Sequence, residues 1–145
     1  MRENMGLYRG KRTDVGKWVY GSLITAGDYY CCVLQDEDAV HPLDFPYLDG
    51  SNGAIDGKAT PVYPYTIGQF SGLTDKSGKR IFEGDVVSGL FLYVSPINGV
   101  CVFRDGAFGL EWERGGAKQF TAFTSMCNVE FEVVGNVHDN PELKG

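Results

Sequence analysis

Apolar and polar positions alternate along much of the chain in the two-residue rhythm of β-strands. Residues 18–24 carry apolar groups on both faces of an expected strand, so this strand is predicted to be covered on both sides. A turn at 26–28 leads into a second apolar run at 29–34. The two runs together predict an N-terminal β-hairpin.

The second half of the chain shows the same rhythm. Asp105 and Gly106 stand between the runs 100–104 and 107–112. A two-residue Asp-Gly connection between alternating strands is a strong hairpin signal. Residues 129–137 alternate in the same way, which predicts a strand with one face in water.

Three other segments of this half are read less directly. Residues 86–94 form a long apolar run, in which Gly89 predicts a bulge or a close approach to the backbone. Residues 95–99 are expected to be a loop. Residues 117–127 leave strand and helix both open, because phenylalanines at helical spacing alternate with threonines that favour strands.

The predicted fold class is all-β, with at most one or two short helices. Glycine supplies 20 of the 145 residues, about twice its usual share. These glycines are spread along the chain, which indicates many tight turns. Short strands at near-regular intervals predict a small bent-sheet barrel or sandwich. The strands after residue 85 resemble those of SH3-like barrels.

Residue type predicts three turns. Asp75 and Gly78 occupy the first and fourth positions of a tight turn, where a side-chain acceptor and a glycine are favoured. Gly84 marks a second turn, between Glu83 and Asp85. The third turn is the Asp-Gly pair at 105–106.

The length predicts a single domain, 1–145, that can bury a core of its own. Within it we expect an N-terminal β-hairpin at 1–34, a long loop at 35–61 and a C-terminal β-barrel at 62–145. The loop is acidic and then rich in proline and glycine. It is either a tolerated surface loop, or a binding loop or oligomer arm built around Phe45 and Tyr47.

Three segments carry a family resemblance. They are IGQFSGLTDKSGKRIFEGDVV at 67–87, KWVYG at 17–21 and VVGNVHDNPEL at 133–143. Together they resemble the YopX family of bacteriophage and prophage proteins, whereas residues 35–61 lie outside the resemblance. It implies a phage or prophage origin, a bacterial cytoplasmic location and self-association. It implies no catalytic residues.

The charge balance argues against a nucleic-acid partner. The chain has 19 acidic and 13 basic side chains, a net charge of −6, whereas phosphate binding depends on basic patches. Arg9, Lys11 and Arg12 form the densest basic cluster, and a local basic face stays open as an alternative.

No membrane partner is expected. No apolar run approaches the roughly 20 residues that cross a bilayer, and the N-terminus shows no apolar signal core. These two observations agree with the cytoplasmic location that the resemblance implies.

The sequence shows no catalytic constellation, so we expect no enzyme and no cofactor. The metal candidates are Glu83 and Asp85, which point to the same side of a strand entry, with His138 as a third. Their alternative role is to bind turn amides or to face water. The four cysteines lack the spacing of a zinc site and are expected to be small buried apolar residues.

The aromatic side chains exceed what one small core obviously needs, and aromatic residues are enriched at subunit interfaces. The alternative is that they fill the core. The interface candidates are Trp18, Tyr20, Phe45, Tyr47 and Trp112.

The leading hypothesis is a non-enzymatic phage accessory protein that forms a homo-oligomer and binds a phage or host protein. The alternatives are a nucleic-acid-associated small β-barrel and a metal-dependent enzyme. The sequence leaves the partner, the subunit number and the role in the phage cycle open.

Overall fold

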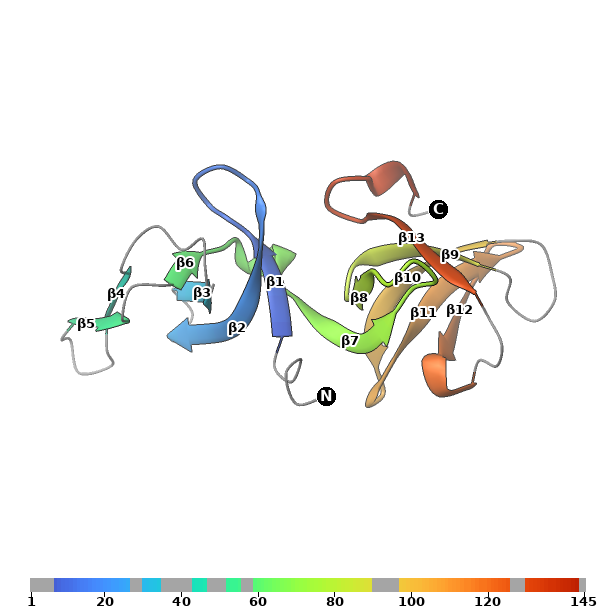
Figure 1. Ribbon diagram of the computed structural model, residues 1–145. Helices are drawn as coiled ribbons and strands as arrows, with labels where there is room; N and C mark the ends of the chain where they lie inside the picture. The colour runs from blue at the N-terminus through green and yellow to red at the C-terminus, as the bar shows by residue number, and fades with distance from the viewer. Residues whose placement is uncertain are drawn as a thin grey trace. The chain divides into compact units, whose positions relative to one another are not determined.

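The computed structural model describes residues 7–26, 30–34, 43–46, 52–55, 59–89, 97–125 and 130–143. In these residues strands alternate with turns and three short 3-10 helices, and there is no α-helix (Figure 1). The all-β prediction is therefore confirmed. Each sheet of the described strands has two ends, so the strands close no barrel. No helix in this part of the chain is long and apolar enough to cross a membrane.

The chain divides into two compact units, Met1–Phe70 and Ser71–Gly145. Strand β7 (Gly68–Thr74) begins in the first unit and ends in the second. Its first residues pair with β1, and β8 is its neighbour on the other side in the sheet order β6-β3-β2-β1-β7-β8. The two units are described separately below.

The N-terminal unit is built on antiparallel strands. The predicted hairpin is β2 (Trp18–Ala26) with β3 (Tyr30–Leu34), joined in register from Ser22 with Leu34 to Ala26 with Tyr30. The sequence pattern missed β1 (Leu7–Lys11), which pairs along its whole length with β2. Its short run of cationic and apolar residues carries too little alternation to be recognised alone.

Described parts of the segment 35–61, which the sequence predicts to be a long loop, are strands. Here β4 (Leu43–Pro46) pairs with β5 (Asn52–Ile55), and β6 (Ala59–Pro61) pairs with β3. These strands are three or four residues long, which is too short for an alternation of apolar and polar residues to be recognised in the sequence.

A small core stabilises the N-terminal unit. Val19 and Val62 are each 3% exposed and pack with Leu23 and Ile67. Gly10 on β1 allows this packing, since a Cβ atom there would lie 2.9 Å from the Cβ atom of Val62.

The C-terminal unit contains a five-stranded antiparallel sheet in the order β12-β11-β10-β9-β13. The strands are β9 (Asp85–Gly89), β10 (Ile97–Arg104), β11 (Ala107–Arg114), β12 (Ala117–Ala122) and β13 (Phe131–Asn136). The predicted hairpin joins β10 to β11, with Arg104 opposite Ala107. Asp105 and Gly106 form its turn, with φ angles of 52° and 82°.

Strand pairing settles the segments that the sequence left open or misassigned. The predicted loop at 95–99 is wrong in its second half, because Ile97 to Gly99 pair with β9. Residues 90–96, including the rest of the predicted 86–94 strand, lie outside the described residues. The ambiguous segment is a strand to Ala122, since β11 pairs with it, and then the 3-10 helix η3 (Phe123–Ser125).

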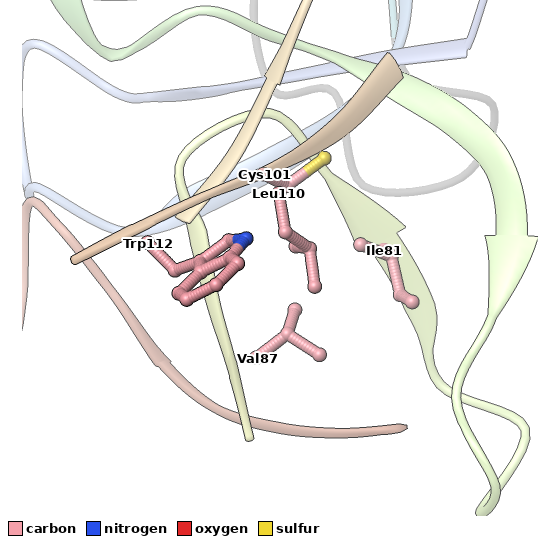
Figure 2. Packing of buried hydrophobic residues seen from close by; sticks show 5 residues of the cluster. All are labelled: Ile81, Val87, Cys101, Leu110 and Trp112. Carbon is pink, nitrogen blue, oxygen red and sulfur yellow. The ribbon is translucent and has the colours of Figure 1, made fainter. Parts of the chain in front are cut away.

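The core of the C-terminal unit lies between β8 (Arg80–Phe82) and the five-stranded sheet. Figure 2 shows its buried cluster: Ile81, Val87, Cys101, Leu110 and Trp112. Full burial of one such aliphatic side chain stabilises the fold by about 1.5–3 kcal/mol. The side chains of the other three cysteines lie outside the described residues.

Gly89 shows the close approach that its position predicts. A Cβ atom there would lie 2.8 Å from Cδ1 of Phe131, on the neighbouring strand β13. Phe131 also packs against the core cluster and meets the ring of Phe123 edge-on, at 5.9 Å between centroids.

Candidate recognition surface

The sequence-predicted metal candidates lie at backbone turns. Asp85 is 2% exposed, and its Oδ2 accepts a hydrogen bond from the Phe82 amide at 2.8 Å. Glu83 is half-buried in the same turn. In the part of the chain that the structure describes, no three His, Cys, Asp or Glu side chains are grouped to hold a metal ion. The Asp85 carboxylate therefore stabilises the turn that precedes β9.

Gly84 fixes this turn to two other segments. Its φ of 89° lies in the left-handed region that favours glycine. Its amide donates to the Cys101 carbonyl at 2.8 Å, and its carbonyl accepts from the Val137 amide at 2.9 Å. The turn thus joins β10 to the segment that follows β13.

His138, the third metal candidate, lies in a turn organised by Asn136. The Asn136 side-chain oxygen accepts hydrogen bonds from the backbone amides of His138 and Asp139, at 3.0 and 2.9 Å. The Asn136 amide group donates in turn to Asp139 Oδ2 at 3.0 Å. These contacts order the turn before the 3-10 helix η4 (Pro141–Leu143).

The predicted interface aromatic residues differ in their exposure and lie in different units. Trp112 is 7% exposed in the C-terminal core, and its indole Nε1 donates to Thr121 Oγ1 at 3.0 Å. Trp18 is half-buried, whereas Tyr20 on the same face of β2 is 44% exposed. The side chain of Phe45 and the whole of Tyr47 lie outside the described residues.

Besides Tyr20, the described residues of the N-terminal unit expose three large apolar side chains, which lie in two segments that contact each other. Val15 is 58% exposed, Tyr63 37% and Tyr65 72%. Val15 lies in the loop between β1 and β2, and the tyrosines lie at the start of the 3-10 helix η2 (Pro64–Thr66). We call these three residues, with the loop Arg12–Lys17, the recognition surface.

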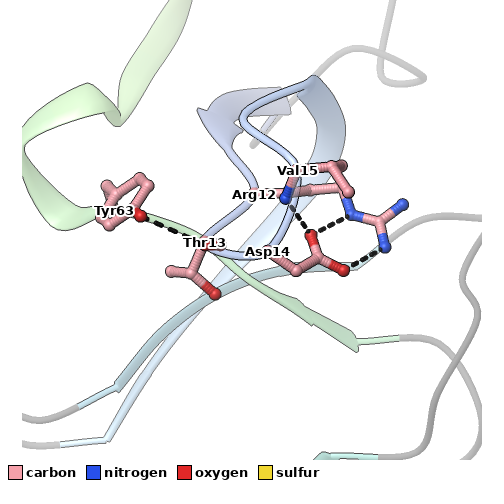
Figure 3. A network of polar contacts seen from close by, with 5 residues as sticks. All are labelled: Arg12, Thr13, Asp14, Val15 and Tyr63. Atoms are coloured by element: carbon pink, nitrogen blue, oxygen red, sulfur yellow. Dashed lines mark hydrogen bonds and ion pairs between the residues drawn. The ribbon is translucent and has the colours of Figure 1, made fainter.

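The loop of the recognition surface is held by its own polar groups (Figure 3). The Arg12 guanidinium donates from Nε to Asp14 Oδ1 at 3.0 Å and from Nη2 to Asp14 Oδ2 at 2.7 Å. Asp14 Oδ1 also accepts the Val15 amide at 2.8 Å. A two-point Arg–carboxylate contact fixes orientation as well as distance. Val15 is therefore presented on an ordered turn.

The backbone closes the same loop. The Arg12 amide donates to the Lys17 carbonyl at 2.9 Å, and the Gly16 amide donates to the Arg12 carbonyl at 3.0 Å. Gly16 has a φ of 68°, a left-handed conformation that glycine adopts without strain.

The ion pair of the loop stays charged at neutral pH. The hydrogen bond between the Arg12 and Asp14 side chains, together with their charge attraction, lowers the pKa of Asp14 and raises the pKa of Arg12. Arg12 and Asp14 thus neutralise each other within the loop. Lys17 of the same loop is exposed.

Three hydrogen bonds join residues 61–63 to residues 11–13. The Tyr63 hydroxyl donates to the Thr13 carbonyl at 3.1 Å (Figure 3). The Thr13 amide donates to the Pro61 carbonyl at 3.2 Å, and the Tyr63 amide donates to the Lys11 carbonyl at 2.9 Å. The rings of Tyr63 and Tyr65 lie 5.6 Å apart, tilted by 33°.

The buried side chain of Thr66 stabilises the recognition surface. It is 2% exposed, and its hydroxyl donates to the Tyr63 carbonyl at 2.6 Å. The same oxygen accepts the Lys11 amide at 2.9 Å. One buried hydroxyl therefore joins the end of β1 to the helix that carries Tyr65.

The sequence did not predict this surface. The available signal was Val15, an apolar residue set between the turn formers Asp14 and Gly16. The contact of this loop with Tyr63 joins residues 50 positions apart in the sequence, so no local pattern predicts it.

The family model for the YopX protein matches residues 7–143. No curated protein matches the chain. The matched range includes the whole recognition surface and both compact units apart from their outermost residues.

Proposed function

Because this chain belongs to the YopX family, we propose that it is a non-enzymatic phage or prophage accessory protein of the bacterial cytoplasm. In this proposal it self-associates and binds a phage or host protein. The recognition surface is the contact site for that second protein.

The order of the recognition surface is the observation that supports this proposal. Binding by a flexible segment loses free energy when side chains and loops are immobilised. Here the loop is held by the Arg12–Asp14 pair, and Tyr63 is held by its hydrogen bond to Thr13. Tyrosine also supplies a large contact area with only two side-chain torsions to fix.

Affinity capture from a bacterial lysate tests the binding half, with wild type and Tyr65→Ser compared directly. If this variant loses a protein that wild type captures, at an unchanged unfolding midpoint, the result supports the recognition surface as the contact site. Phe103→Ser is the matched control, since Phe103 is a 54% exposed aromatic residue of the other unit. Equal capture by Tyr65→Ser and wild type would contradict the proposal.

Size-exclusion chromatography with light scattering tests the self-association half. We expect a mass above that of one chain at micromolar concentration, falling on dilution. A single-chain mass throughout the micromolar range removes self-association from the proposal.

We also propose an SH3-like relation for the C-terminal unit. Its first long strand, β9, lies between β10 and the last strand β13, and the short helix η3 precedes that last strand. This order supports a bent sheet of the kind that the sequence pattern resembles. Fold alone does not fix function.

Nucleic-acid binding is a second candidate function. It is favoured by a local group of cations and aromatic rings, which the net charge of the whole chain does not reveal. On β1 and β2, Lys11 Nζ lies 5.5 Å from the centroid of the Trp18 ring, and the guanidinium of the buried Arg9 lies 4.5 Å from the same centroid. Tyr20 stands opposite Arg9 in the register. Interleaved cations and aromatic rings are typical of single-strand binding. Absence of salt-sensitive binding to oligonucleotides at low ionic strength would exclude it.

A further inference from the structure

The outer edge of β12 has no neighbouring strand in the described part of the C-terminal unit. The sheet order ends at β12, which pairs only with β11. An exposed strand edge is a template for pairing with another chain.

The register of the β11–β12 hairpin shows which backbone groups face outward. Gly115 and Gly116 form a two-residue turn with φ angles of 59° and 83°, between Arg114 and its partner Ala117. In such a hairpin the flanking pair exchanges hydrogen bonds, and every second pair along the strands does the same. The amides and carbonyls that face away from β11 are therefore those of Lys118, Phe120 and Ala122.

The opposite edge of the same sheet is covered by the chain itself. The Lys76 amide donates to the Phe131 carbonyl of β13 at 2.9 Å, and the Val133 amide donates to Asp75 Oδ2 at 3.0 Å. The turn at Asp75 thus occupies edge groups of β13. Of the two ends of this sheet, only β12 is left open in the described residues.

We propose that two copies of the chain pair their β12 strands antiparallel, across a two-fold axis at Phe120. This inference rests on the proposed self-association and names β12 as the strand through which the two copies make contact. Phe120 would face Phe120 of the second copy, and Lys118 would face Ala122 of the second copy. All three outward residues then exchange backbone hydrogen bonds.

Charge and strand length select this register. A two-fold axis at Lys118 would place two lysines directly opposite each other, which is unfavourable. An axis at Ala122 would leave most outward groups unpaired, because the strand ends there. The axis at Phe120 places no like charges opposite each other and pairs the backbone groups of all three outward residues.

The Phe120 ring packs on its own sheet, which leaves the outward backbone groups of β12 to make the contact. A Cβ atom at Gly109 would lie 2.7 Å from Cζ of Phe120, so the ring lies over the glycine of the neighbouring strand. The Arg104 guanidinium lies 5.7 Å from the same ring. Because β13 is covered, pairing through β12 joins two copies of this sheet and does not continue into a fibre.

Concentration-dependent amide exchange of the wild-type protein, followed residue by residue, tests the proposal. We expect the amides of Lys118, Phe120 and Ala122 to become protected as concentration rises. Those of Gln119 and Thr121 bond within the hairpin and are expected to be protected at every concentration. Outward amides that stay unprotected in a self-associated sample would overturn the proposed contact.

Two variants at one position give an independent test. Lys118→Pro removes an outward amide that the hairpin does not use, and we expect it to weaken dimerisation about tenfold or more. Lys118→Ala keeps the amide and is expected to dimerise like wild type. A dimer unaffected by the proline refutes the β12 contact but leaves self-association standing. A strictly monomeric wild type refutes both.

Discussion

The carboxylate of Asp75 accepts a hydrogen bond at 3.0 Å from the backbone amide of Val133, 58 positions further along the chain. Its other oxygen accepts the amides of Ser77 and Lys79, each at 2.9 Å. One buried carboxylate therefore closes its own turn and fixes that turn onto β13.

Asp75→Asn is expected to destabilise the folded state by about 2 kcal/mol, because one acceptor oxygen becomes a donor facing backbone amides. Urea unfolding measures the change. Asp105→Asn is the matched control, since Asp105 is an exposed turn residue with a φ of 52°, which asparagine also adopts. We expect the control to stay within about 0.5 kcal/mol of wild type. Equal losses in the two variants would show that the Val133 contact adds nothing.

The same carboxylate predicts a pH dependence of stability. Burial alone would raise the pKa of Asp75, but hydrogen bonds from the Val133, Lys79 and Ser77 amides outweigh it, and the net pKa is lowered. A folded-state pKa below the unfolded value gives stability that is present above the unfolded value, about 3.9 for aspartate. That stability is lost as pH falls through the lower, folded-state pKa.

Urea unfolding of wild type and Asp75→Asn over a pH series checks this. The difference in unfolding free energy between the two proteins is expected to be constant near neutral pH and to shrink in acid, below the unfolded pKa of aspartate. A difference that does not change with pH would refute the assignment.

Local signals predicted the elements that depend on neighbouring residues. The β10–β11 hairpin follows from Asp105 and Gly106, whose backbone conformations select the turn. The close approach at Gly89 follows from a missing side chain inside an apolar run. In both cases a few adjacent residues contain the whole physical cause.

Contacts between distant segments could not be predicted in this way. Nothing near Asp75 in sequence indicates that Val133 will be its partner. The recognition surface has the same origin, because the Arg12–Lys17 loop meets Tyr63 only after the end of β1 is joined to the segment that contains Thr66. The sequence could propose aromatic contact residues but not select among them.

Gly10 predicts a packing dependence in the N-terminal core. Gly10→Ala would place a Cβ atom 2.9 Å from Cβ and Cγ2 of Val62, so we expect a loss of about 2 kcal/mol from overpacking. Val62→Ala removes buried apolar volume and is also expected to destabilise. In the double variant the new methyl group occupies part of the vacated space, so the combined loss should be smaller than the sum. Additive losses, measured by urea unfolding, would contradict direct contact.

Loss of the Arg12–Asp14 ion pair is expected to weaken partner binding while leaving the stability of the fold almost unchanged. Asp14→Asn removes the two-point contact with Arg12. Exposed ion pairs add little to stability, so the urea midpoint is expected to move little. Binding to the protein captured by wild type is expected to weaken, because Val15 is then presented on a less ordered loop. Isothermal titration with that protein measures the effect.

Asp139→Asn is the matched control for this last prediction. Asp139 also accepts a side-chain hydrogen bond within an exposed turn, from Asn136 at 3.0 Å, but it belongs to the other unit. It is expected to bind the partner as wild type does. If Asp14→Asn also binds at full strength, loop order does not contribute to recognition, and the tyrosines alone would have to account for the contact. A lower unfolding midpoint in Asp14→Asn, together with weaker binding, would instead indicate that the ion pair supports the fold of the unit.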